Sequence, residues 1–222
     1  MKKINHTIFA LSLVSLLSCG QQDHQNIRLS TNKEDLSLKG DYQVILRPLN
    51  HHLSGWIPNG KSEIKIDEDK MNLSSWLDDS SSVPHRQFIL TGKRCPVASD
   101  DLNQDGVIDV METFKASGKV LIPLDDNLGT QISPYESFPF GNFSYQEEIK
   151  ISALEDDLRE VDLDTTDHVV KLPRKDPLNL ENKVMIVLGV SEKRFLPDSI
   201  QALEGVSRQL STPIVCGLIQ RK

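Results

Sequence analysis

The sequence has few aromatic residues, few cysteines and a deficit of basic residues, and each of these shortages excludes a class of protein. Of its 222 residues, 5% are aromatic and only three are cysteine. Its 25 Lys and Arg are outnumbered by 32 Asp and Glu, whereas nucleic-acid binding needs clustered basic side chains that neutralise phosphates. We therefore expect no nucleic-acid partner. A charged fraction of 26% excludes a polytopic membrane protein, while 38% hydrophobic residues suffice for the core of one folded domain.

Sequence motifs of the common catalytic sites are absent as well. There is no Gly-x-Ser-x-Gly, no His-Glu-x-x-His and no glycine-rich phosphate-binding loop. The acidic run at residues 155–160 offers paired carboxylates of the kind used in glycoside hydrolysis, but such runs usually form a solvated surface. We expect no catalytic residues and a function other than catalysis.

The amino terminus has the pattern of a secretory signal peptide. Two lysines precede an apolar run at residues 8–17, which is too short to cross about 30 Å of hydrocarbon. The four residues that end at Cys19, Leu-Leu-Ser-Cys, resemble the lipobox of bacterial lipoproteins. In that family the signal peptide is removed and the cysteine, now the first residue, is acylated. The resemblance implies a signal peptide at residues 1–18 and a lipidated Cys19.

A lipid anchor at Cys19 implies a position in the cell envelope, outside the cytoplasm, with the membrane as a partner. Acyl chains hold a protein at a membrane by burial of about 0.8 kcal/mol per CH₂. Gly20 follows the cysteine, where an Asp would resemble a signal for retention at an inner membrane. In a cell with two membranes we therefore expect the outer one. An unknown envelope protein stays open as a further partner.

After the anchor, the chain divides into a tether and one domain. Residues 19–38 are polar and aperiodic, as a tether would be. Residues 39–222 alternate short apolar runs with Gly, Pro, Asn and Asp, which is typical of antiparallel strands joined by turns. The sequence predicts strands at residues 42–46, 62–67, 72–77, 86–90, 119–124, 146–151, 168–172, 184–188 and 213–219.

These strands predict an all-β fold, an antiparallel sandwich or barrel with long loops and little helix. Residues 152–161 and 197–210 are suited to a short helix each. The two tryptophans, Trp56 and Trp76, are expected in the core or at the rim of the barrel.

Residues 101–112 resemble the twelve-residue calcium loop of EF-hand proteins at every diagnostic position. Ca²⁺ takes six to eight oxygen ligands. Gly106 stands at position 6, where the turn needs a positive φ, and Ile108 is the apolar residue at position 8. The alternative is a surface turn that is merely rich in Asp, Asn and Gly. The candidate Ca²⁺ ligands are the side chains of Asp101, Asn103, Asp105, Asp109 and Glu112 and the backbone carbonyl of Val107.

The flanks of this loop depart from the EF-hand family. A helix should precede Asp101, but residues 94–99 include a proline and a cysteine. Only the exit side, residues 110–116, suits a turn or two of helix. We expect a lone loop inserted in a β-domain, less preorganised than a paired one, with an affinity on the order of 10⁻⁵ to 10⁻³ M. The expected role of the cation is structural, since it would neutralise clustered carboxylates and order the loop.

The cysteine count predicts one disulfide. With Cys19 lipidated, Cys95 and Cys216 remain as an even pair in an oxidising compartment. Two free thiols are the alternative. A bridge between them would close about 120 residues and stabilise the fold by roughly 4–5 kcal/mol on the chain-entropy model.

The surroundings of these two cysteines resemble the copper/zinc superoxide dismutases. Residues 213–219, Pro-Ile-Val-Cys-Gly-Leu-Ile, are similar to the C-terminal strand that carries one half of that family's intrasubunit disulfide. Cys95 follows a strand that begins near His85, much as the other half follows a strand there. The resemblance covers about residues 40–222 and implies a Greek-key barrel.

The copper site of that family does not carry over. Copper there is held by several imidazoles, including a His-x-His pair on one strand. At that place this chain has Phe88 and Leu90, and Leu188 stands where a further histidine is expected. Two alternatives to a non-catalytic calcium-binding protein stay open. One is an envelope metalloenzyme of the copper/zinc type with relocated ligands, and the other is a calcium-responsive envelope protein that binds a partner.

Overall fold

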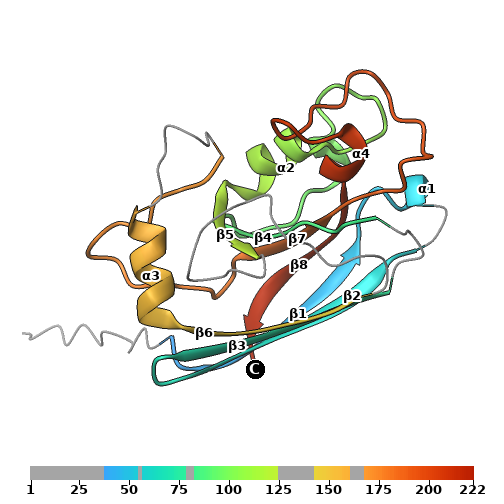
Figure 1. Cartoon of the computed structure of the whole chain (residues 1–222). Helices are drawn as coiled ribbons and strands as arrows, with labels where there is room; N and C mark the ends of the chain where they lie inside the picture. The colour runs from blue at the N-terminus through green and yellow to red at the C-terminus, as the bar shows by residue number, and fades with distance from the viewer. Residues whose placement is uncertain (1–37, 55–56, 79–82, 125–142, 161–167) are drawn as a thin grey trace, which may run out of the picture. The chain divides into compact units, whose positions relative to one another are not determined.

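Eight strands form one antiparallel sheet in residues 38–54, 57–78, 83–124, 143–160 and 168–222, the residues that the computed structural model describes (Figure 1). Their order across the sheet is β5–β4–β7–β8–β1–β2–β3–β6. The prediction of a mostly antiparallel β-protein with little helix is confirmed. The strands are β1 Gly40–Pro48, β2 Asn59–Asp67, β3 Lys70–Asp78, β4 Gln87–Leu90, β5 Val120–Leu124, β6 Phe143–Lys150, β7 Val184–Leu188 and β8 Pro213–Arg221.

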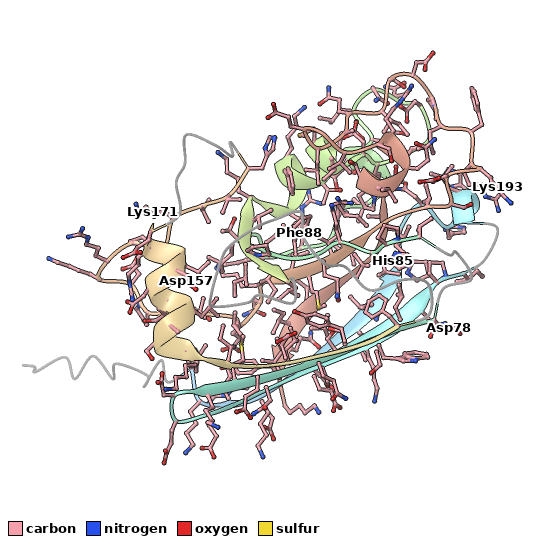
Figure 2. All side chains as sticks on the ribbon, in the orientation of Figure 1. Asp78, His85, Phe88, Asp157, Lys171 and Lys193 are labelled. Carbon is pink, nitrogen blue, oxygen red and sulfur yellow. A yellow bond between two sulfur atoms is a disulfide. The ribbon has the colours of Figure 1, made fainter. Side chains whose placement is uncertain are left out.

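The strand β8 joins the two halves of this sheet. It pairs with β1 along one edge and with β7 along the other. Figure 1 shows β1, β2, β3 and β6 as one layer, β4, β5 and β7 as a second, and β8 leading from one to the other. Side chains from both layers fill the space between them (Figure 2). The chain crosses between the layers after β3 and returns as β6, which pairs with β3.

The two layers differ in their sequence pattern because they differ in how many faces are covered. In β2 and β3 every second side chain is buried and the others face solvent. In β4, β5 and β7 every residue is buried. One face of these strands packs on the first layer, where Ile89 belongs to the main core. The other face packs under helix α2, Val110–Ser117, where Phe88 contacts a second cluster that includes Phe114.

Helix α3, Ile151–Glu160, continues directly from β6 and confirms the helix predicted at residues 152–161. Asp69, in the β2–β3 turn, accepts hydrogen bonds from the backbone N–H and the hydroxyl of Ser152. Leu154 and Leu158 bury the helix against the core. None of the helices in the described part of the chain is long and apolar enough to cross a bilayer.

Two predicted elements were wrong in whole or in part. Residues 168–172 form no strand, and Val169 makes only an isolated parallel bridge to Val120. Val169 and Leu172 are nevertheless buried, so their apolar character reflects packing beside β5 rather than a strand. Of residues 197–210, only the start of helix α4, Arg208–Ser211, is helical. Gly205, with a φ of 69°, lies in a turn just before it.

Trp76 is not in the core, which was one of the two places expected for it, because the residue is 44% exposed. It lies on the outward-facing side of β3, between the buried Ser75 and Leu77. The alternation of the strand decides its position, not its size or hydrophobicity. Trp56 lies outside the described residues.

Two neighbours on β3 test the orientation of this strand. Leu73 is buried in the core, whereas Asn72 points outward. We expect Leu73→Ala to lower the free energy of unfolding by about 2–5 kcal/mol, because it removes buried methyl groups and leaves a cavity. Asn72→Ala, the control, should change it by less than about 0.5 kcal/mol. Urea denaturation measures both values, and a similar loss in the two variants would contradict the register of β3.

Candidate metal centre

The loop at residues 101–112 connects a short 3₁₀ turn, η1 Ala98–Asp100, to helix α2. Two of its residues have positive φ, Gln104 at 58° and Gly106 at 86°. A Cβ added at Gly106 would meet no atom within 4 Å. The glycine is therefore required by the conformation of the turn and not by crowding.

The side chains at positions 1, 3 and 5, Asp101, Asn103 and Asp105, accept hydrogen bonds from backbone N–H groups of the loop itself. Asp101 accepts hydrogen bonds from the N–H of Asp105 at 3.2 Å and of Gly106 at 2.8 Å. Asn103 Oδ1 accepts from the N–H of Asp105 at 3.0 Å. Asp105 Oδ1 accepts from the N–H of Val107 at 2.9 Å. These short-range bonds turn all three predicted ligand side chains toward the loop's own backbone.

The side chains at positions 9 and 12 close the loop onto helix α2. Asp109 caps the helix by accepting from the N–H of Glu112 at 2.9 Å, and Glu112 Oε2 accepts from the N–H of Asp109 at 3.0 Å. This reciprocal pair is a capping box. Glu112 Oε1 also reaches the start of the loop, where it accepts from the N–H of Leu102 at 2.7 Å. The side chain at position 12 therefore reaches the beginning of the loop, next to position 1.

Two of these carboxylates are buried without a cationic partner. Asp109 is 1% exposed and Glu112 is 4% exposed. Neither of them, nor Asp101 or Asp105, makes an ion pair within the described residues. Burying a charge is costly unless it is compensated, and backbone N–H groups and the N-terminus of α2 supply only part of the compensation. The loop carries four negative charges that no basic side chain there balances.

The carboxylate oxygens of the loop do not converge on one point in this structure. Within the described ranges, no group of three or more His, Cys, Asp or Glu side chains is gathered in a way that would hold a metal ion. The carboxylate oxygens are instead distributed over the amides of the loop. Each such oxygen has two lone pairs, so an oxygen with a single hydrogen bond keeps an acceptor site free. Glu112 Oε1 is the exception among the ligand oxygens, because it accepts from the N–H of Leu102 at 2.7 Å and from that of Asn103 at 3.3 Å.

Residues from elsewhere in the chain also hold the loop. The side chain of Asn50 exchanges two hydrogen bonds with the backbone of Ile108. Ser199 Oγ donates to Asp105 Oδ2, and the N–H of Gln201 donates to Asp109 Oδ2 at 2.9 Å. No local sequence pattern marks these three residues, because they lie 58 to 94 residues from their partners.

The entry to the loop is fixed by an ion pair and a disulfide in place of a helix. The guanidinium of Arg94 bonds both carboxylate oxygens of Asp100, at 2.6 and 2.8 Å. Cys95 is bridged to Cys216 of β8, with the two Cα atoms 5.9 Å apart. This is the pair expected from the cysteine count, and it ties the entry of the loop to β8.

The positions compared with copper ligands are occupied by packing residues. Phe88 and Leu90 are buried in the cluster beneath α2, and Leu188 is buried at the end of β7. His85, labelled with Phe88 in Figure 2, is fully buried, and its Nδ1 lies 3.0 Å from the carbonyl oxygen of Leu188. Cys19, the predicted lipidation site, lies outside the described residues.

Comparison with known proteins adds no assignment to this site. No model of a known protein family matches the chain, and no curated protein matches it.

The ion pair at the loop entry predicts a pH dependence of stability. The guanidinium of Arg94 lowers the pKa of Asp100 from 3.8 to about 2. Because the folded-state pKa lies below the unfolded one, the contribution is complete above about pH 4 and is lost as the pH falls toward 2. We expect Asp100→Asn to lower the free energy of unfolding by about 1 kcal/mol or less at pH 6, and the difference from the wild type to shrink steadily as the pH falls toward 2.

Chemical denaturation between pH 2 and pH 6 measures this difference. The control is Asp198→Asn, since the carboxylate of Asp198 is 98% exposed in its ion pair with Arg208. It should change stability little at any pH. A difference for Asp100→Asn that stays constant down to pH 2 would contradict the interpretation.

Proposed function

We propose that this chain is a lipid-anchored, extracytoplasmic calcium-binding protein, in which Ca²⁺ orders a loop of a superoxide dismutase-like β-domain and no reaction is catalysed. The ligands are the side chains of Asp101, Asn103, Asp105, Asp109 and Glu112 and the carbonyl of Val107. The anchor is an acylated Cys19 at the end of a tether, which holds the domain at a membrane of the cell envelope.

The observation that carries the proposal is the negative charge of residues 101–112, which backbone N–H groups compensate only in part. Asp109 and Glu112 are buried without a basic partner in the part of the chain that the structure describes, and two further carboxylates lie on the same loop. A cation bound by their free lone pairs would offset this charge. The spacing of the oxygens and the positive φ of Gly106 suit a large, oxygen-seeking cation.

Ca²⁺ fits this set of ligands better than the common alternatives. All six ligand groups are oxygens, and neither a sulfur nor an imidazole nitrogen is among them, which favours a hard cation over zinc or copper. Mg²⁺ demands a stricter octahedral geometry at shorter distances. A glutamate that binds through both oxygens suits the larger ion.

The strand order supports the resemblance to the superoxide dismutases. The strands β1, β2 and β3 are consecutive neighbours, and the last strand, β8, lies beside β1, an order that is compatible with the proposed barrel. The disulfide joins the C-terminal strand to the segment after β4, as the resemblance implied. The residues at the copper-ligand positions, Phe88, Leu90 and Leu188, have no metal-binding groups, which favours a domain without the family's redox chemistry.

The disulfide also supports a location outside the cytoplasm. Structural disulfides persist in oxidising compartments and are rare in the cytosol. Such a location provides calcium at the concentrations that a site of low affinity requires.

Calcium titration of the purified full chain, kept in detergent, tests the site. At a Ca²⁺ concentration 100 times the Kd, the free energy of unfolding should rise by about 2.7 kcal/mol. Isothermal titration calorimetry gives the Kd, and thermal unfolding with and without Ca²⁺ gives the stabilisation.

Three substitutions of similar size assign this effect to the loop. Asp101→Asn and Glu112→Gln should abolish most of the stabilisation by Ca²⁺. Glutamine can still complete the capping box, so Glu112→Gln separates loss of charge from loss of the helix cap. Asp156→Asn, on the exposed face of α3, should leave the effect intact. A melting temperature of the wild type that is the same with and without Ca²⁺ would refute the proposal.

A further inference from the structure

The backbone N–H and carbonyl of Ile108, at position 8 of the loop, are both hydrogen-bonded, as they would be in a β-strand. Their partner is the side chain of Asn50 rather than a neighbouring strand. The N–H of Ile108 donates to Asn50 Oδ1 at 2.9 Å, and its carbonyl accepts from Asn50 Nδ2 at 2.8 Å. The amide of Asn50 offers one acceptor and one donor, as a neighbouring strand would. A loop that was expected to lack a partner therefore has one, supplied by a single asparagine.

Asn50 is itself held rigidly by β8. Its Nδ2 also donates to the carbonyl of Pro213 at 3.0 Å, and the preceding N–H, of Leu49, donates to the carbonyl of Ile214 at 2.7 Å. Asn50 is 8% exposed and has a φ of 54°, a conformation that asparagine tolerates better than most residues. The side-chain amide of Asn50 therefore has few accessible orientations, and through it the backbone of Ile108 is connected to β8.

A second segment holds the opposite side of the loop. Ser199 lies in the connection between β7 and α4, and its hydroxyl donates to Asp105 Oδ2. The other oxygen of Asp105 accepts from the loop itself, at Val107. The orientation of this carboxylate is thus set from two sides.

We propose that Asn50 and Ser199 are positioning residues of the calcium site, which hold the loop in its binding conformation without being ligands. This inference rests on the proposed function. Ordering a flexible loop costs conformational entropy, and holding it in the bound conformation beforehand lowers that cost and raises affinity. Residues that orient metal ligands from behind typically change metal affinity by about 10–100-fold when they are removed.

The first test compares Asn50→Gly with Asn182→Gly in the full chain. Glycine accepts the positive φ of Asn50 and removes only the side chain. Asn182 is a matched control, because it has a φ of 59°, is exposed, and lies next to Ile219 at the other end of the β7–β8 pair. We expect the Kd for Ca²⁺, measured by calorimetry at 15 °C, to rise about 10–100-fold in Asn50→Gly and to stay unchanged in Asn182→Gly.

The second test uses an exposed residue whose replacement leaves the core untouched. Ser199→Ala removes the hydroxyl that bonds Asp105, and Ser144→Ala, on the outer face of β6, is the control. We expect a rise in the Kd of several-fold to about tenfold for Ser199→Ala and none for the control. This variant decides the outcome if Asn50→Gly does not fold.

The possible results separate this inference from the proposed function. A purely structural role would lower the melting temperature of Asn50→Gly equally with and without Ca²⁺, with the Kd unchanged. An unchanged Kd in both Asn50→Gly and Ser199→Ala, alongside calcium binding by the wild type, overturns this inference alone. Failure of the wild type to bind Ca²⁺ overturns both.

Discussion

The pairing of β8 with both β1 and β7 is the constraint on which the rest of this structure depends. It brings the two layers of the sheet face to face, so that each buries its apolar side on the other. The same strand fixes the loop at residues 101–112, through the Cys95–Cys216 disulfide at the loop entry and through Asn50, which bonds Pro213 and Ile108. A loop without an entering helix is thereby attached to the most central part of the sheet.

The loop combines rigid attachment with unbalanced charge. Buried carboxylates are usually paired with basic residues, yet the basic side chains that the structure pairs with acids lie elsewhere, for instance Lys70 with Glu148 and Arg159 with Glu155. Arg94 stands close by in the sequence, but it is paired with Asp100 and not with a predicted ligand. The carboxylates of the loop thus have no basic partner among the described residues, which is the observation on which the proposed function rests.

Local patterns in the sequence predicted most of the elements correctly and failed where packing outweighs them. The strands at 62–67 and 72–77 were predicted from their sequence patterns and lie within β2 and β3, where burial alternates because the period of a strand is two. The apolar residues at 168–172 were read as a strand, although they pack beside β5 without forming one. Trp76 was expected in the core or at the rim of the barrel, whereas its place in the alternation of β3 puts it on the outer face.

The sequence by itself determined the twelve-residue spacing of oxygens, the helix that follows it and the pair of cysteines, because these are properties of short segments or simple counts. Only the tertiary structure decided that Asn50, Ser199 and Gln201 would meet this loop. Their partners are distant along the chain, and their contacts arise from the closure of β8 against β1 and β7. No local propensity encodes contacts of that kind, since they exist only once the sheet has formed.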